Sequence, residues 1–410
     1  MVSYNAAVNL DLLRELSVPN ETKIVLCVVD GLGGMPHPET GRSELEAANI
    51  PHLDLLAKES YCGLTVPVGY GITPGSGPGH LALFGFDPLG YTVGRGVLEA
   101  LGVDFDLQPD DVAARGNFCT LDPDGRIVDR RAGRIPTEEN AERCARLRKI
   151  ALPGVELFVE PVREHRFLLV LRGKGLGDRL PDTDPQREGV APLEASGRDA
   201  ASQRTADLVN SFVRQAREAL SRYGRANGLT LRGFAKRPDM PAIGDVCKFR
   251  PAAIAVYPMY RGLAKLVGMT VLATGSSFED EIATLHEHRD AFDFFFIHYK
   301  YADSAGEDGD FEAKMAALER FDERVPDLLA FDPDVLMIAG DHATPAVLAS
   351  HSWHPVPFLM RVKRFAGSAL NGADSFNERA CRGGVMGTFP AKEALPLAMA
   401  YAGRLTKYGA

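Results

Sequence analysis

The 410-residue sequence has no apolar run of the roughly 18–20 residues that a helix needs to cross a bilayer. Its N-terminal segment carries Asp11, Arg14 and Glu15 where a signal peptide would have an apolar core. The six cysteines are widely spaced and form no Cys-x-x-Cys pair, so neither a zinc knuckle nor a disulfide framework is indicated. We therefore expect a cytoplasmic protein with reduced thiols and no membrane partner.

Long runs of like charge are also missing. The chain has 46 Lys and Arg against 55 Asp and Glu, a formal charge of −9 at pH 7. No nucleic-acid partner is indicated, and an anionic ligand would have to be held by local positive charge. With 45% hydrophobic and 25% charged residues, the composition is that of a globular protein long enough for two or three domains, or for one with an insertion.

What the sequence does contain is a set of short apolar runs rich in β-branched or aromatic residues. Buried strands are predicted at Lys23–Asp30, Asp290–His298 and Asp334–Asp341. Helical patterns lie between them, notably at Asn49–Ser60 and Phe311–Arg324. Strands that alternate with helices predict an α/β fold with a doubly wound, mainly parallel sheet.

The middle of the chain is different, being rich in Arg, Asp, Gly and Pro. It contains one predicted strand at His165–Arg172 and an amphipathic helix at Thr205–Tyr223. Strands that end in acidic residues occur on both sides of this region. We therefore expect an inserted α+β domain at residues 112–237, within a larger domain built from residues 1–111 and 238–410.

Acidic residues follow the predicted strands. Asp30, Asp303 and Asp341 lie at or shortly after strand ends, where ligand-binding groups gather in an open α/β sheet. Glu307 follows Asp303 by one helical turn, so both carboxylates could reach one cation. Each motif also has a simpler interpretation, because Asp-Gly is common in turns and an acidic loop is usually solvated.

Three histidines, His342, His351 and His354, lie close to Asp341 in the sequence. Carboxylates together with imidazoles are the ligands of hydrolytic Zn or Mn sites. The alternative is a group of surface histidines without a metal.

Ser76 stands among glycines and prolines in the segment Thr73–His80. Glycine lets the backbone approach a phosphate, and a helix that starts at about Leu81 would add a favourable dipole. The segment lacks the Gly-Lys-Ser/Thr ending of a Walker loop and the Gly-x-Ser-x-Gly of a hydrolase elbow. It is either a flexible loop or, beside two metals, the position of an activated nucleophile.

Arginines are frequent in the middle region, at Asp129–Arg134 and at Arg166, Arg172 and Arg232. Guanidinium groups bind carboxylate and phosphate in bidentate fashion, so an arginine-rich cap over an acidic metal site suits a small phosphorylated acid. A solvated arginine surface is the alternative.

In this order, the motifs resemble those of the cofactor-independent phosphoglycerate mutases of the archaeal type, members of the alkaline phosphatase superfamily. The resemblance extends over nearly the whole chain, through Val29–Gly33, Pro51–Ala57, Thr73–Phe84, Gly94–Gly102, Asp129–Arg134, Glu164–Phe167, Gly340–His342 and Pro355–Pro357. It implies an alkaline-phosphatase-like domain interrupted by a cap. It also implies an isomerase that interconverts 3-phosphoglycerate and 2-phosphoglycerate without bisphosphoglycerate.

The resemblance implies the site residues one by one. Ser76 matches the nucleophile that would carry the phosphoryl group. Two divalent metal ions are implied, one held by Asp30, Ser76, Asp341 and His342, the other by Asp303, Glu307 and His351. Substrate binding is implied for Asp129, Arg130 and Arg134, with Arg232 and Arg261 as further anion ligands.

Two positions depart from the family pattern. The family usually has histidine where Glu307 stands, and a glutamate is a harder ligand that favours Mn²⁺ or Mg²⁺ over Zn²⁺, with Co²⁺ also allowed. His354 stands where the family more often has Asp before Pro-Val-Pro. It either supplies the missing imidazole or packs elsewhere.

The leading hypothesis is therefore a metal-dependent mutase that uses a phosphoserine at Ser76 and serves glycolysis or gluconeogenesis. The same features also suit a metal-dependent phosphomonoesterase or a mutase of another small phosphorylated acid. The change at Glu307 allows a third hypothesis, a paralogue that has lost turnover. The sequence is compatible with a homo-oligomer.

Overall fold

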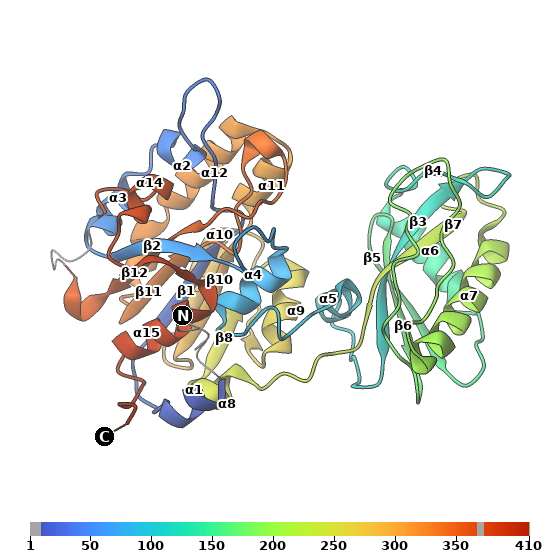
Figure 1. The fold of residues 1–410 in the computed structure, drawn as a ribbon, viewed down its shortest axis with the longest axis horizontal. Helices are drawn as coiled ribbons and strands as arrows, with labels where there is room; N and C mark the ends of the chain where they lie inside the picture. The colour runs from blue at the N-terminus through green and yellow to red at the C-terminus, as the bar shows by residue number, and fades with distance from the viewer. Residues whose placement is uncertain (1–9, 367–372, 410) are drawn as a thin grey trace, which may run out of the picture. The chain divides into compact units, whose positions relative to one another are not determined.

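A computed structural model describes residues 10–366 and 373–409 (Figure 1). The chain divides into two compact units, one made of Met1–Thr92 and Met240–Ala410, the other of Val93–Asp239. Within the described residues, no helix combines the length and the apolar character that crossing a bilayer requires.

The larger unit is built on an eight-stranded sheet with the order β13-β2-β12-β11-β1-β10-β8-β9. Neighbouring strands are parallel except where β12 pairs antiparallel with β2 and β11. The strands are β1 (Ile24–Val29), β2 (Tyr61–Val66), β8 (Pro251–Ile254), β9 (Thr270–Val271), β10 (Phe294–Tyr299), β11 (Val335–Ala339), β12 (Val356–Val362) and β13 (Gly387–Pro390). The expected mainly parallel α/β sheet is confirmed.

Helices cover both faces of this sheet (Figure 1), which makes it doubly wound. One face packs against α3 (Pro51–Lys58), α10 (Phe278–Glu287), α12 (Phe311–Asp322) and α13 (Val325–Ala330). On the other face lie α4 (Ser76–Leu83), α8 (Ile243–Cys247), α9 (Pro258–Leu266) and α15 (Ala394–Tyr401). The remaining α-helices of the unit are α1 (Leu10–Leu16), α2 (Glu44–Ala47), α11 (Tyr301–Glu307) and α14 (Glu378–Arg382).

Burial on both faces explains the uninterrupted apolar runs. Along β10, Phe295 belongs to the core on the α10 side, whereas Phe294 stacks on Phe249 and Phe296 meets Phe84 edge-on on the other side. Neither face of the strand is exposed to solvent, so the alternation of apolar and polar residues typical of a half-exposed strand is absent.

The smaller unit is an antiparallel sheet of five strands, β4 (Ile127–Asp129), β3 (Val112–Leu121), β6 (Arg166–Arg172), β5 (Glu156–Arg163) and β7 (Gly228–Ala235), in which β7 pairs with β3. Its helices are α5 (Arg95–Gly102), α6 (Thr137–Leu147) and α7 (Ala200–Leu220). Helix α7 begins before the expected Thr205 because the carboxylate of Asp199 accepts a hydrogen bond from the backbone N–H of Ser202 and caps the helix.

The smaller unit also starts earlier than the residue 112 that composition suggested. It includes α5, which packs on β3 so closely that a Cβ on Gly96 would lie 2.2 Å from the carbonyl oxygen of Ala113. The expected boundary at residue 112 rests on a change in composition. Helix α5 resembles the region before it in composition, but it packs with the strands that follow it.

Candidate metal and phosphate site

Three carboxylates meet at the carboxyl edge of the large sheet. Strand β1 lies between β10 and β11 in parallel register, with Val28 opposite both His298 and Ala339. Asp30 directly follows β1, Asp341 follows β11 after one residue, and Asp303 lies in α11 after β10. The three side chains are almost completely buried. The topology therefore brings together residues that the sequence placed at separate strand ends.

The first group of potential ligands is Asp30, Asp341 and His342, with one ligand atom of each within 4.8 Å of the others. Nε2 of His342 lies 3.4 Å from Oδ1 of Asp30 and 3.2 Å from Oδ2 of Asp341. Ser76, the first residue of α4, places its Oγ 3.2 Å from the same Nε2. All four residues expected for one metal are thus adjacent in the structure.

The second group is Asp303, His342 and His351. Nε2 of His351 lies 3.5 Å from Oδ1 of Asp303, and the rings of His342 and His351 stack with centroids 3.7 Å apart. Glu307 is not part of this group. Its Oε1 lies 3.5 Å from Nε2 of His351 and its side chain is 55% exposed, so it borders the group beside that histidine.

His354 contacts neither group. Its Nδ1 lies 3.0 Å from the hydroxyl of Ser352, and its ring stacks on Trp353. Of the two sequence interpretations, packing elsewhere is the one that agrees with this position.

The donor set fits a divalent cation. Buried Oδ1 of Asp30 and Oδ2 of Asp341 have no hydrogen-bond partner among the described residues. Burial, together with the negative charge of Asp30, raises the pKa of Asp341 to about 6, because two carboxylates in a dry site resist ionising together. Carboxylate oxygens beside an imidazole nitrogen are ligands that Mn²⁺, Co²⁺ and Zn²⁺ accept, and a cation would relieve both the repulsion and the unsatisfied oxygens.

Lys300 is a site residue that the sequence interpretation missed. Its Nζ lies 3.0 Å from Oδ2 of Asp30 and also forms an ion pair with Asp303. Burial alone would lower the pKa of Lys300, but these two carboxylates raise it above its usual value, so the ammonium stays charged. The available signal was its place directly after β10 and three residues before Asp303.

The loops that carry the ligands are fixed by a second layer of contacts. The hydroxyl of Thr344 donates to Oδ1 of Asp303 at 2.7 Å and lies 3.0 Å from Nδ1 of His342. Nζ of the buried Lys314 donates to the backbone oxygens of Thr344 and Gly33, at 2.8 and 2.9 Å. One ammonium group thereby joins the loop after β1 to the loop after β11.

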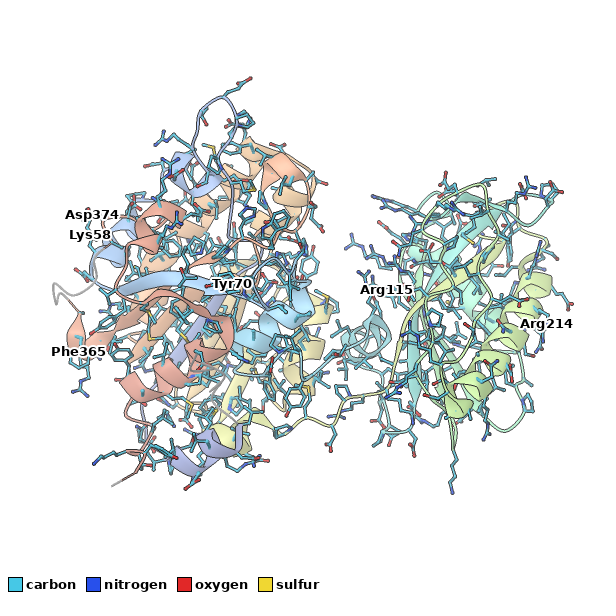
Figure 2. The ribbon with its side chains drawn as sticks, viewed as in Figure 1. Lys58, Tyr70, Arg115, Arg214, Phe365 and Asp374 are labelled. Atoms are coloured by element: carbon cyan, nitrogen blue, oxygen red, sulfur yellow. The ribbon has the colours of Figure 1, made fainter. Side chains whose placement is uncertain are left out.

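The smaller unit contains a strongly basic cavity of about 290 Å³. It is lined by Arg95, Arg115, Asn117, Arg130, Arg131, His165, Arg166, Asp184, Gln186 and Arg232. Arg115 points from the sheet face opposite α7, the helix that carries Arg214 (Figure 2). Burial and the charge of nearby Arg115 lower the pKa of both Arg95 and Arg166, so positive charge exceeds negative charge here.

Buried polar atoms in this cavity also lack partners. Among the described residues, Nε of Arg115, Oδ1 of Asn117 and Nδ1 of His165 make no hydrogen bond. Arg130 is already held by Asp184 through two hydrogen bonds of 3.2 and 2.8 Å. A small anion with several acceptor oxygens matches the unpaired Nε–H of Arg115, whereas Oδ1 of Asn117 is an acceptor and matches a hydroxyl of such a ligand.

The residues expected to bind the substrate do not all lie at this cavity. Arg130 and Arg232 line the cavity, but Asp129 and Arg134 do not. The carboxylate of Asp129 accepts hydrogen bonds from the backbone N–H groups of Arg131 and Gly133, so it stabilises a turn. Arg261 lies on α9 in the larger unit.

The chain is similar to known proteins over nearly its whole length. A family model described as 2,3-bisphosphoglycerate-independent phosphoglycerate mutase matches residues 57–223. A probable 2,3-bisphosphoglycerate-independent phosphoglycerate mutase from Thermus thermophilus is 51% identical over 404 residues, covering 97% of this chain and 98% of that protein. The relative of the same name from Thermotoga maritima is 48% identical over 405 residues, which cover 98% of this chain and 99% of the relative.

Two solved structures share the fold. The PH0037 protein from Pyrococcus horikoshii superposes with a TM-score of 0.80 at 26% identity, covering 96% of this chain and 100% of that one. The cofactor-independent phosphoglycerate mutase from Thermoplasma acidophilum gives a TM-score of 0.68 at 29% identity, with 93% of this chain and 100% of that one covered.

Proposed function

The chain belongs to the family of 2,3-bisphosphoglycerate-independent phosphoglycerate mutases, an isomerase family, and we propose that it interconverts 3-phosphoglycerate and 2-phosphoglycerate through a phosphoserine at Ser76. The observation that carries this proposal is the position of Ser76 Oγ beside His342, where the first ligand group meets the start of α4. We propose the cytoplasm as the place of action, since glycolytic acids are found there.

We further propose two divalent cations, with Mn²⁺ as the favoured metal. One would be held by Asp30, Ser76, Asp341 and His342, the other by Asp303 and His351 with Glu307 as an exposed third ligand. A cation bound at a serine hydroxyl lowers the pKa of that hydroxyl, and this is the chemistry that the metal supplies.

The side chains of the larger unit would then position the phosphoryl group. Ser76 Oγ loses its proton and attacks phosphorus, the bond from phosphorus to the glycerate oxygen breaks, and that oxygen takes up a proton. The second glycerate hydroxyl then loses its proton and attacks the phosphorus of the phosphoserine, the bond from phosphorus to Oγ breaks, and Oγ takes up a proton, which restores Ser76. Lys300 Nζ lies 3.0 Å from Oδ2 of Asp30, and Ser76 is the first residue of α4. From these positions the ammonium group and the helix N-terminus would stabilise the negative oxygens of the phosphoryl group.

The basic cavity of the smaller unit would hold the glycerate. Several guanidinium groups suit an acid that carries both a carboxylate and a phosphate. Between the two transfers the glycerate must be retained while it turns, because attack by water on the phosphoserine would make the enzyme a phosphatase. We therefore assign Arg130 and Arg232 to substrate binding, together with Arg95, Arg115 and Arg166.

The test is to incubate the purified, Mn²⁺-loaded protein with 3-phosphoglycerate in the absence of bisphosphoglycerate and to quantify both 2-phosphoglycerate and free phosphate. We expect 2-phosphoglycerate with little phosphate, and loss of the reaction on chelation. Steady release of phosphate without an isomer would identify a phosphatase. If neither 2-phosphoglycerate nor free phosphate formed, the result would support the hypothesis of a paralogue that has lost turnover.

A further inference from the structure

The two carboxylate oxygens of Asp30 have different surroundings. Oδ2 accepts a short hydrogen bond from the hydroxyl of Tyr260 and lies 3.0 Å from Nζ of Lys300 and 3.3 Å from Nε2 of His298. Oδ1 has no hydrogen-bond partner among the described residues and faces Nε2 of His342 at 3.4 Å. One oxygen is therefore fully engaged by protein groups, whereas the other is left for a ligand.

The phenol of Tyr260 is held rigidly in this position. The side chain comes from α9, is fully buried, and stacks on the ring of His298 with centroids 3.6 Å apart. The ring of His80 lies on another side, with its centroid 4.7 Å from that of Tyr260. In such a packed environment the hydroxyl cannot swing away without disturbing its neighbours.

The same aromatic group contacts the other components of the first ligand group. Nδ1 of His80 lies 3.2 Å from Oδ2 of Asp341 and 2.8 Å from the backbone oxygen of Ser76. The buried rings of His80, Tyr260 and His298 thus pack together, and their polar atoms contact Asp30, Ser76 and Asp341.

We propose that Tyr260 is a positioning residue whose hydroxyl fixes Oδ2 of Asp30 so that Oδ1 is presented to the cation. The inference rests on the proposed function, because it takes Asp30 to be a metal ligand. Groups that orient a metal ligand through a hydrogen bond change metal affinity by about 10–100-fold when they are removed. Tyr260 is neutral, unlike Lys300, so it sets the direction of the carboxylate without changing the net charge of the site.

The test is Mn²⁺ binding to the full-length Tyr260→Phe protein, measured by calorimetry or by competition with a chelating dye. Phenylalanine keeps the ring stack and the volume and removes only the hydroxyl. Asp30→Asn and Asp303→Asn identify which binding component belongs to which ligand group. We expect Tyr260→Phe to weaken the Asp30-dependent component about 10–100-fold and to leave the Asp303-dependent component unchanged. The Mn²⁺ concentration for half-maximal activity should rise in parallel.

Tyr299→Phe is the matched control. Tyr299 is also buried, but its hydroxyl donates to the backbone oxygen of Ala317 at 2.6 Å on the opposite face of the sheet. This variant should lose stability without losing Mn²⁺ affinity. Wild-type affinity in Tyr260→Phe, or an equal loss in Tyr299→Phe, would overturn the inference. If Asp30→Asn itself left Mn²⁺ binding unchanged, the metal assignment of the proposed function would be at fault.

Discussion

Ser76 and His342 stand 266 residues apart in the sequence, yet the serine Oγ lies 3.2 Å from the imidazole Nε2. This approach depends on Gly79, because a Cβ at that position would lie 2.1 Å from the backbone oxygen of Asp341. Helix α4 can therefore pack against the loop after β11 only where it has no side chain. Gly79 therefore serves this close packing, in addition to any role of the glycines around Ser76 in approaching a phosphate.

Replacing Ser76 by alanine should abolish isomerisation. The substitution removes the oxygen that would form the bond to phosphorus, and loss of a nucleophile typically costs on the order of 10³-fold or more in kcat. Substrate binding in the smaller unit should persist. The measurement is the rate of 2-phosphoglycerate formation, alongside 3-phosphoglycerate binding by calorimetry. Ser350→Ala, at an exposed serine in the loop that leads to His351, should retain activity, and a normal rate in Ser76→Ala would reject the nucleophile assignment.

The sequence was sufficient to locate the carboxylates but not the groups that orient them. Asp30, Asp303 and Asp341 follow apolar runs, and parallel strands must bring such positions to one edge of a sheet. Tyr260 comes from α9 and meets Asp30 across a separation of 230 residues, and local pattern carries no information about such a contact. Its pattern within α9 is that of an ordinary buried aromatic residue.

The basic cavity was predictable only in part, for a related reason. Arg130 was found because it lies in a dense arginine motif, but the same motif led to Asp129, whose side chain closes a turn. Arg95 and Arg115 come from α5 and β3, and only the fold of the smaller unit places both at one cavity. A cluster assembled from separate elements leaves no spacing signal in the sequence.

Replacing Lys314 by methionine should destabilise the protein by about 3–5 kcal/mol, because a buried carboxylate would lose its counter-ion. Nζ of Lys314 lies 3.7 Å from Oε1 of Glu44, and both side chains are completely buried. The free energy of unfolding in urea measures the effect. Adding Glu44→Gln should recover part of the loss, since glutamine carries no charge and still offers an oxygen to the N–H of Ala346. Simple additivity of the two substitutions would contradict this explanation.

Glu281 should make the protein less stable as pH rises. Burial raises the pKa of this carboxyl group to about 8, above its usual 4.5, so the folded state holds a proton that the unfolded state has lost between these values. In that window the contribution of Glu281 to the free energy of unfolding falls by up to about 1.4 kcal/mol per pH unit, and above pH 8 it stays at its lowest value.

The Glu281→Gln variant tests this contribution, because glutamine does not titrate and can still accept from the N–H of Val256. Its stability relative to wild type should increase between about pH 5 and pH 8, as measured by urea denaturation at each pH. Any change in the free energy of unfolding that the substitution causes at every pH cancels when the differences from wild type at two pH values are compared. A difference that is independent of pH would show that Glu281 is already ionised in the folded protein at the acidic end of this range.

Replacing Arg166 by alanine should raise KM for 3-phosphoglycerate by about 10–100-fold, the equivalent of one or two charge-assisted hydrogen bonds. The residue lines the basic cavity. Mn²⁺ affinity should not change, because the proposed metal ligands belong to the larger unit. Arg214→Ala removes the same charge from the exposed side of α7 and should have little effect. Equal changes in KM for the two variants would indicate a general electrostatic effect.

Glu307 should make metal uptake at the second ligand group depend on pH. Burial would lower the pKa of His351, but its contact with Glu307 and the backbone oxygen of Pro74 raise it to about 9. The histidine therefore carries a proton at neutral pH that a metal must displace. Mn²⁺ affinity of the Asp303-dependent component should rise with pH up to about 9. In Glu307→His this rise should occur at lower pH, because the carboxylate that stabilises the proton on His351 is gone. The affinity for Zn²⁺ should also increase relative to that for Mn²⁺, because imidazole is a softer ligand than carboxylate.

Calorimetric titration with Mn²⁺ and Zn²⁺ from about pH 6 to pH 9 distinguishes these effects. Glu312→His, at an exposed position on the nearby helix α12, controls for the addition of a histidine to the surface. If Glu307→His and Glu312→His both kept the wild-type pH dependence and metal preference, Glu307 would be neither a ligand nor the group that holds the proton on His351. Glutamate at position 307 would then have no consequence for the metal, and the first ligand group, together with Asp303 and His351, would have to suffice for catalysis.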